Sequence, residues 1–232
     1  MMKMTAINED CFLIQVAEDI DLDLTDKIAY LSEQIESSLA DSLLDITPSY
    51  TTILVQYDLL KVAPLVVEKQ LESIIFQCAQ KTVAKRSDKI IQLPVYYDPS
   101  VGWDLPALSA KTGLSVEQII TLHSETRYRV CAIGFAPGFA FLAQVPPSIS
   151  IARHHSPRAL VPAGSVAIAD TQTAVYPANS PGGWQIIGNC PTRLFDLNQH
   201  PISPFSVGDN VQFKPISRDE FIHLGGKIVD EK

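Results

Sequence analysis

Beyond residue 127 the chain consists largely of short apolar runs separated by turn residues, and this feature constrains the fold most. The runs are of strand length, and proline, glycine and aspartate stand between them. Such a series is typical of a closed or nearly closed antiparallel barrel. Gly208 and Asp209 mark the last turn. The predicted strands have the sequences YRVCAIG, GSVAIAD, TAVYP, WQIIG, TRLFD and NVQFKPI.

Before residue 98 the chain follows a different order, in which strands alternate with amphipathic helices. The pattern predicts, in order, a strand at 11–17, a helix from Thr25 to Leu39, a hairpin at 43–58, a helix that begins at Pro64 and a strand at 90–97. This β-α-β-β-α-β succession is the split βαβ, or ferredoxin-like, arrangement. The change of pattern predicts an α+β chain of two domains, residues 1–88 and residues 89–232.

The acidic composition limits the possible partners. With 26 acidic and 18 basic residues the formal charge is −8, which would repel nucleic acid and anionic membrane surfaces. No apolar run approaches the ~20 residues of a membrane span, and the first residues do not resemble a secretory signal, so we expect a cytoplasmic protein. The four cysteines form no C-x-x-C pair and are expected to be reduced thiols.

Self-sufficient catalytic signatures are missing from the sequence. It contains no G-x-x-x-x-G-K-[ST], no G-x-S-x-G and no H-E-x-x-H motif, which argues against a stand-alone hydrolase of a familiar type. We therefore expect an incomplete site.

His123 is a candidate acid or base. A short helix is predicted at 104–112, and Ser115 with Gln118 forms a capping box for a second helix, which runs to about His123. A histidine at a helix end can simply favour the helix dipole, or it can transfer protons if the helix end faces a cleft. Both interpretations stay open. We expect no metal site, because no second ligand stands three or four residues away.

Two loops combine turn residues with aromatic rings. In SPGGWQIIG, Pro181 and Gly182 suit a type II turn whose bare backbone is held by the strand that follows Trp184. In GFAPGFAFL, Phe135 and Phe139 flank a turn, and this segment is either a hydrophobic hairpin that plugs a barrel end or a loop that faces a ligand.

A third segment, RHHSPR at residues 153–158, gathers basic residues in an otherwise acidic protein. It is either a solvated loop or a site for a carboxylate or phosphate. In the second case Arg158 can hold the anion through two parallel hydrogen bonds.

Taken together, these motifs resemble the KipI family, whose members are called the B-type subunit of 5-oxoprolinase or allophanate hydrolase subunit 1. The resemblance covers residues 90–216 strongly and the first domain more loosely. It is carried by QLPVYYDPSVGWDLPALSAKTGLS, LHSETRYRVCAIGFAPGFAFL, PRALVPAGSVAIADTQTAVYP, SPGGWQIIGNCP and FSVGDNVQFKPI.

The resemblance implies a ferredoxin-like N-terminal domain and a cyclophilin-like β-barrel. It also implies a subunit of an ATP-dependent 5-oxoprolinase, which opens 5-oxo-L-proline to L-glutamate together with partner subunits of the KipA type and the LamB/YcsF type. ATP, accompanied by Mg²⁺ and shared with a partner subunit, is the implied cofactor. The alternatives are a regulator that inhibits a sensor histidine kinase, and a carboxyltransferase-type or allophanate hydrolase subunit.

The family pattern also indicates candidate site residues. The catalytic candidates are His123 and Arg158. The candidates for binding substrate or a partner lie in the motifs above; they are Gly134, Phe135, Pro137, Gly138, Phe139, Pro162, Gly164, Gln172, Tyr176, Pro181, Gly182, Gly183 and Trp184.

This chain departs from the family pattern at a few positions. The family usually has glycine where this chain has Asp170, and a glycine or similar residue near Ala174. It also has GRTP where this chain reads GNCP, with Asn189 in place of the arginine. Loss of that fixed charge means that Arg193 or the 153–158 segment compensates, or that anions bind more weakly here.

Overall fold

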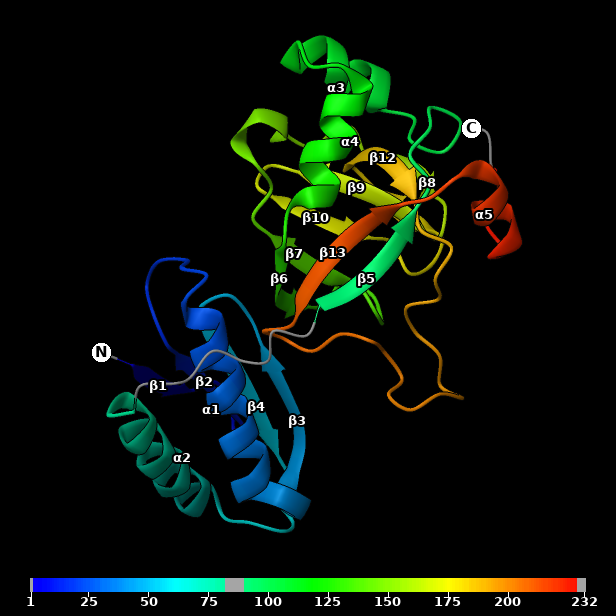
Figure 1. Ribbon diagram of the computed structural model, residues 1–232. Helices are drawn as coiled ribbons and strands as arrows, with labels where there is room; N and C mark the ends of the chain where they lie inside the picture. Colours follow the sequence, from blue (N-terminus) through cyan, green and yellow to red (C-terminus); the bar gives the residue numbers. More distant parts are fainter. Residues whose placement is uncertain (1, 82–89, 229–232) are drawn as a thin grey trace. The chain divides into compact units, whose positions relative to one another are not determined.

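The computed structural model describes residues 2–81 and 90–228. Contacts within the chain divide it into two compact units, Met1–Ser87 and Asp88–Lys232, which we call the N-terminal unit and the barrel unit. In Figure 1 the first is blue to teal and the second runs from green to red. The predicted boundary at residues 88 and 89 lies outside the described residues.

The N-terminal unit is a four-stranded antiparallel sheet with two helices, and its strand order is β1-β2-β4-β3. Alternate residues of β2 and β4, such as Phe12, Ile14, Ile53 and Val55, are buried, as expected for strands with one face against a core. The elements are β1 (Lys3–Ala6), β2 (Cys11–Gln15), α1 (Leu24–Leu39), the 3₁₀ helix η1 (Ala40–Ser42), β3 (Leu43–Pro48), β4 (Thr52–Tyr57) and α2 (Pro64–Ala79).

The edge strand of this sheet differs from the prediction. β4 lies between β2 and β3, so the β2-α1-β3 segment is a split βαβ unit, as predicted. However, the strand predicted at 90–97 does not join this sheet: β5 (Ile90–Val95) pairs in parallel with β13 (Asn210–Pro215) of the barrel unit. β1, which the sequence did not indicate, pairs with β2 instead. β1, which precedes β2 in the sequence, thus supplies the fourth strand of the ferredoxin-like sheet in place of the strand predicted at 90–97.

The barrel unit is built on a seven-stranded sheet with the order β12-β9-β10-β7-β6-β13-β5. Tyr96 and Asn189 join its two edges, because each backbone amide donates to the other residue's carbonyl oxygen at 2.9 Å. The predicted barrel is therefore closed, although its β5–β13 pair is parallel. Its other strands are β6 (Tyr128–Ile133), β7 (Ala140–Ala143), β9 (Ser165–Ala169), β10 (Gln172–Val175) and β12 (Gln185–Asn189).

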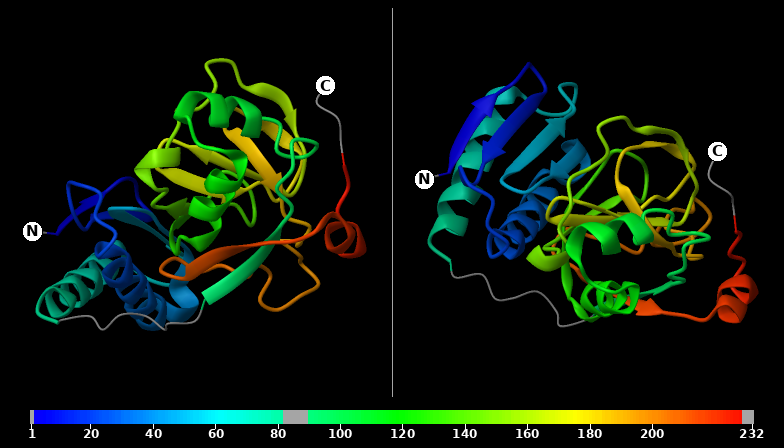
Figure 2. Two further views of the ribbon diagram at one scale, coloured as in Figure 1. Left: turned by 45° about the horizontal axis from the view of Figure 1, so that its top comes forward. Right: turned by 90° about the horizontal axis from the view of Figure 1, so that it is seen from above.

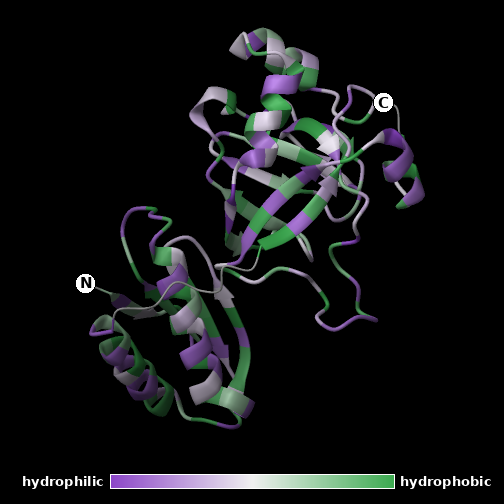
Figure 3. Ribbon diagram, in the orientation of Figure 1, coloured by the Kyte–Doolittle hydropathy of each residue, from purple (hydrophilic) through white to green (hydrophobic). Residues whose placement is uncertain are grey.

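Smaller elements surround the barrel. Ser115 and Gln118 form the predicted capping box at the start of α4, and α5 follows β13 on the outside of the unit (Figure 2). In Figure 3 hydrophobic and hydrophilic residues are interspersed along β5 and β13 as well as along α1 and α2. These elements are α3 (Leu105–Thr112), α4 (Val116–Glu125), the 3₁₀ helix η2 (Pro147–Ile149), β8 (Arg158–Val161), β11 (Ser180–Gly182) and α5 (Arg218–His223).

The strand predicted from TRLFD is wrong, because residues 192–196 form an irregular loop. Leu194 is buried, which explains the apolar signal. Arg193 donates from Nε to the carbonyl oxygen of Phe195 at 3.1 Å, and its Nη1 lies 3.0 Å from Oδ2 of Asp196. This segment thus makes local hydrogen bonds and an ion pair through its own side chains, and it does not pair with a neighbouring strand.

Asp170, where the family usually has glycine, lies between β9 and β10. It has a φ of 53°, in the left-handed region that glycine adopts freely and aspartate tolerates better than most residues. Its amide donates to the carbonyl oxygen of Ile151 at 2.7 Å. The departure therefore keeps a backbone conformation that suits glycine.

We expect Gly164→Ala to lower the free energy of unfolding of the barrel unit by about 2–4 kcal/mol. Gly164 has a φ of 83°, and an added Cβ would overlap the carbonyl oxygen of Cys190 and approach Oδ1 of Asn189. Urea unfolding followed by tryptophan fluorescence measures the loss, because both tryptophans, Trp103 and Trp184, lie in the barrel unit.

Gly134→Ala is the matched control, because a Cβ on Gly134 would meet no atom within 4 Å. Its unfolding free energy should stay within about 0.5 kcal/mol of the parent value. Equal losses for the two variants would contradict the steric explanation.

Candidate functional site

A cavity of about 370 Å³ opens in the barrel unit, and we call it the aromatic pocket. Its lining combines five aromatic rings, a single charged side chain and the backbone of a glycine pair. The lining residues are Phe135, Phe139, Phe141, Arg153, Pro157, Tyr176, Pro181, Gly182, Gly183 and Trp184. The two loops that the sequence indicated, one bearing Phe139 and the other Gly183, therefore share one cavity.

Phe139 is the centre of the aromatic cluster and is almost fully buried. Its ring centroid lies 5.1 Å from that of Phe135, 4.9 Å from Phe141, 5.4 Å from Tyr176 and 5.7 Å from Trp184. All four pairs meet at steep angles, which is a favourable arrangement for aromatic rings. The floor of the pocket is therefore rigid and apolar.

Phe135 stands at the rim of this pocket in a strained conformation. Its φ is 71°, which is unusual for a bulky residue, and its side chain is 66% exposed. A left-handed conformation costs a large residue about 1–3 kcal/mol and is found most often at functional sites. Phe139 is a buried core residue, as in the hydrophobic-hairpin interpretation, whereas Phe135 is exposed and lines the pocket, so its role toward a ligand stays a prediction.

The glycine pair differs from the predicted type II turn. Gly182 belongs to β11, which pairs with β8, and it is not among the residues with positive φ. A Cβ on Gly182 would instead overlap the hydroxyl oxygen of Tyr176. Burial raises the pKa of Tyr176, although the Trp184 amide and two nearby arginines oppose this shift, so the phenol keeps its proton at neutral pH.

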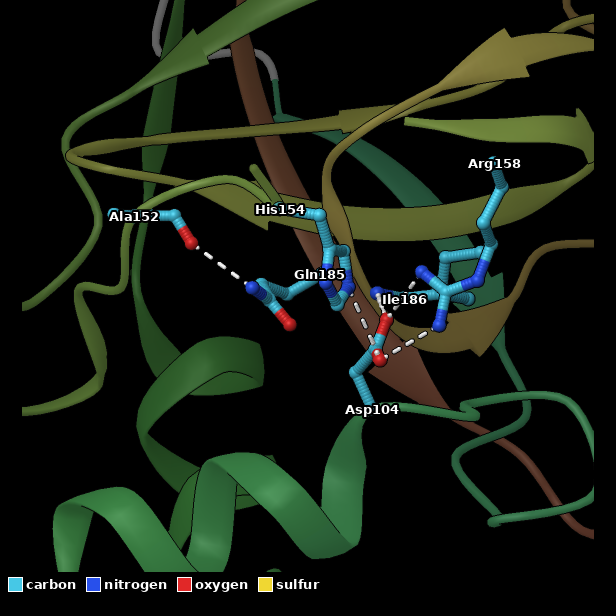
Figure 4. Close-up of polar contacts among 6 residues, drawn as sticks. All are labelled: Asp104, Ala152, His154, Arg158, Gln185 and Ile186. Atoms are coloured by element: carbon cyan, nitrogen blue, oxygen red, sulfur yellow. Dashed lines mark hydrogen bonds and ion pairs between the residues drawn. The ribbon is translucent and has the colours of Figure 1, made fainter. Parts of the chain in front are cut away.

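Asp104 lies beside the pocket wall and accepts several hydrogen bonds (Figure 4). Arg158 donates to it from Nη1 at 3.0 Å and from Nη2 at 2.8 Å, and the amide of Ile186 donates at 2.6 Å. Nε2 of His154 lies 3.2 Å from Oδ1 of the same carboxylate. Asp104 is 5% exposed, so this is a buried ionic cluster.

The position of Arg158 corrects the sequence interpretation. Its fork of two nitrogens was expected to hold a ligand anion, but it holds Asp104 of the same chain. Its guanidinium also lies 5.6 Å from the ring of Trp103. The cation on the pocket wall is instead Arg153, which is exposed and has no ion pair within residues 2–81 and 90–228.

His123 does not reach the aromatic pocket. It is fully buried, with Nδ1 2.7 Å from the hydroxyl of Tyr97 and Nε2 2.9 Å from Oγ1 of Thr173. Because Thr173 donates its own proton to Ala167, Nε2 must carry the imidazole proton. Burial lowers the pKa of His123 to about 3. It is thus a neutral histidine buried in the core, and it does not line the aromatic pocket.

The remaining sequence candidates lie in three places. Pro162 and Gly164 line a second cavity of about 410 Å³ with Arg193 and Lys227, so they are not part of the aromatic pocket. The other four do not line the aromatic pocket either: Gly134, Pro137 and Gly138 belong to the loop that carries Phe135 and Phe139, and Gln172 starts β10.

Sequence reasoning missed Asp104 and Pro157. The only sign of Asp104 was its place at the start of a predicted helix. Its partner Arg158 is 54 residues away, and no local pattern connects the two. Pro157 lay within the basic segment that was noted for its charges.

Several structural features bear on possible chemistry. Within residues 2–81 and 90–228 there is no group of three His, Cys, Asp or Glu side chains that could hold a metal ion. The four cysteines are free and buried. Among the described residues, no helix is long and apolar enough to cross a membrane.

Residues 2–205 match the family described as carboxyltransferase domain, subdomain C and D, and the chain belongs to this family. Within it, the chain is 32% identical over 223 residues to the B-type subunit of 5-oxoprolinase from Bacillus subtilis (strain 168). This alignment covers 93% of each protein. The predicted resemblance to this 5-oxoprolinase subunit is confirmed.

Solved structures share this fold. The protein TTHA0988 matches with a TM-score of 0.77 and 31% identity over 89% of this chain, which spans 40% of that longer protein. Kluyveromyces lactis urea carboxylase matches with a TM-score of 0.71 over 96% of this chain and 22% of that protein. At 16% identity, the second likeness shows the fold alone. The predicted α+β fold class with a cyclophilin-like barrel is confirmed.

Proposed function

We propose that this chain is the B-type subunit of a 5-oxoprolinase, which opens 5-oxo-L-proline to L-glutamate. The observation that carries the proposal is the 32% identity, over 93% of both chains, to a protein named as that 5-oxoprolinase subunit. Partner subunits of the KipA type and the LamB/YcsF type complete the enzyme, and we place it in the cytoplasm, where ATP is abundant.

The aromatic pocket suits this substrate class. 5-Oxoproline is a small ring with a lactam and a carboxylate, and the pocket offers apolar ring faces together with the exposed cation of Arg153. Rings of Phe135 and Trp184 can pack on the substrate ring while Arg153 pairs with the carboxylate. The pocket lies open at the surface, as expected for a site covered by another subunit.

The chemistry explains why the chain needs no nucleophile of its own. A lactam carbonyl is a poor electrophile, and transfer of phosphate from ATP to its oxygen would activate the ring carbon toward water. Such a reaction depends on positioning and charge stabilisation. We propose that ATP and Mg²⁺ bind at a site shared with the partner subunits, and that this chain holds the organic substrate.

The test is reconstitution with the proteins encoded next to this chain. The three-subunit mixture should form ADP and glutamate in a 5-oxoproline-dependent reaction, and omission of this chain should abolish both products. The proposal is wrong if the mixture turns over 5-oxoproline equally well without this chain, or if the complete mixture has no such activity.

The family match favours one alternative, a carboxyltransferase-type or allophanate hydrolase subunit. Urea and allophanate are smaller than 5-oxoproline and lack its apolar ring edge. Turnover of urea or allophanate in place of 5-oxoproline by the same mixture would establish this alternative.

A further inference from the structure

Arg153 is an exposed cation on a firmly held backbone. On one side, the carbonyl oxygen of Ala152 accepts a hydrogen bond from Nε2 of Gln185 at 2.9 Å. On the other side, the amide of His154 donates to the carbonyl oxygen of Gly183 at 2.6 Å. The Arg153 side chain itself has no hydrogen bond or ion pair within the described residues. Its place on the pocket wall is therefore set by its neighbours.

Asp104 connects those neighbours. Its carboxylate contacts His154, which follows Arg153, and Arg158 at the end of the 153–158 segment, and it accepts from the amide of Ile186 on β12. The backbone amide of Asp104 also donates to the carbonyl oxygen of Ile186 at 2.8 Å. Figure 4 shows the carboxylate between these groups. One buried side chain thus joins the start of α3, the 153–158 segment and the strand that follows Trp184.

The burial of this cluster strengthens the attraction between its charges. Asp104 and Arg158 have side-chain exposures of 6% and 17%, so their attraction is screened less than that of a surface pair. Loss of the negative charge would remove the carboxylate that holds both His154 and Arg158, and would weaken the hold on the segment. A displacement of about 1 Å at a group that orients substrate can change a rate or affinity by about 100-fold.

We propose that Asp104 is a positioning residue of the aromatic pocket, which sets substrate affinity by holding the 153–158 segment so that Arg153 faces the ligand's carboxylate. This inference rests on the proposed function. Asp104 contacts no substrate itself and acts through Arg153.

The kinetic test is a double-mutant cycle in the reconstituted enzyme. Asp104→Asn should raise KM for 5-oxoproline about tenfold, with kcat within about twofold. Arg153→Gln should raise KM by a similar factor. Because both changes act on the same contact, Asp104→Asn in the Arg153→Gln background should add less than about a twofold change. Equal factors in both backgrounds would overturn the proposal.

Controls separate positioning from general destabilisation. Asp98→Asn is the matched variant, because Asp98 is also an acceptor before α3 but its carboxylate interacts with Ser100, Tyr96 and Arg218, and its KM should not change. His154→Gln keeps the Asp104–Arg158 pair and should give a smaller KM rise of the same kind. If Asp98→Asn raised KM as much as Asp104→Asn does, the positioning role would be refuted.

A second measurement does not depend on activity. In a Trp103→Phe background, Trp184 is the sole tryptophan and reports on the pocket. Asp104→Asn should increase acrylamide quenching of Trp184, and Arg153→Gln should not. Unchanged quenching in Asp104→Asn would refute the inference even if the enzyme proves inactive with 5-oxoproline, so its failure is distinct from failure of the proposed function.

Discussion

Lowering the pH from 7 to 4 is expected to reduce the free energy of unfolding of the barrel unit by about 3 kcal/mol through His123 alone. Its pKa in the folded protein is about 3, below the ordinary value of 6.5. The unfolded chain therefore binds a proton below pH 6.5 that the folded chain does not bind. The contribution of neutral His123 to the free energy of unfolding is fully present above pH 6.5, and it is lost as the pH falls toward 3.

His123→Gln isolates this effect from other titrating groups. Glutamine retains a donor and an acceptor for Thr173 and Tyr97 but does not titrate. Urea unfolding at pH 7, 6, 5 and 4 should show a pH dependence that is weaker in the variant by up to about 1.4 kcal/mol per pH unit. NMR of the histidine rings gives a second readout, in which His123 should stay neutral down to pH 4. Equal pH dependence in both proteins would contradict the account of His123.

Phe139→Ala is expected to lower the free energy of unfolding of the barrel unit by about 3–5 kcal/mol. The Phe139 ring is 2% exposed and contacts four other rings. Its removal would leave a cavity beneath the pocket and allow Phe135 and Trp184 to move. Urea unfolding followed by tryptophan fluorescence measures the change.

Phe135→Ala is the comparison for this prediction. Phe135 is on the same loop but is 66% exposed, so its removal should change the unfolding free energy by less than about 1 kcal/mol. Similar losses for Phe135→Ala and Phe139→Ala would show that Phe139 is not the structural centre of the cluster.

Local patterns predicted most strands and helices but not every pairing. Alternation in β2 and β4 and the capping box at Ser115 depend on neighbouring residues, so they are readable from the sequence. The strand at 90–95 was also readable, but its partner was not, because β13 begins at Asn210. The TRLFD prediction failed because Leu194 is buried in a loop that gives the same apolar signal as a strand.

The candidate site was predictable to a similar extent. Phe135, Phe139 and Trp184 stood out because aromatic rings flank turns in two motifs, and the structure brings them into one pocket. The role of Arg158 was misread because its counter-ion, Asp104, lies on a distant segment. His123 was ambiguous because a helix end can face either a cleft or the core, and only tertiary packing distinguishes the two.

The most direct test of the aromatic pocket as the substrate site is the activity of the reconstituted enzyme with Phe135→Ala in this chain. We expect kcat/KM for 5-oxoproline to fall at least about tenfold, with the unfolding free energy nearly unchanged. Phe76→Ala removes an equally exposed ring, 67% against 66%, from α2 of the other unit and should leave kcat/KM unchanged. Full activity in the Phe135→Ala enzyme would contradict the assignment of the pocket.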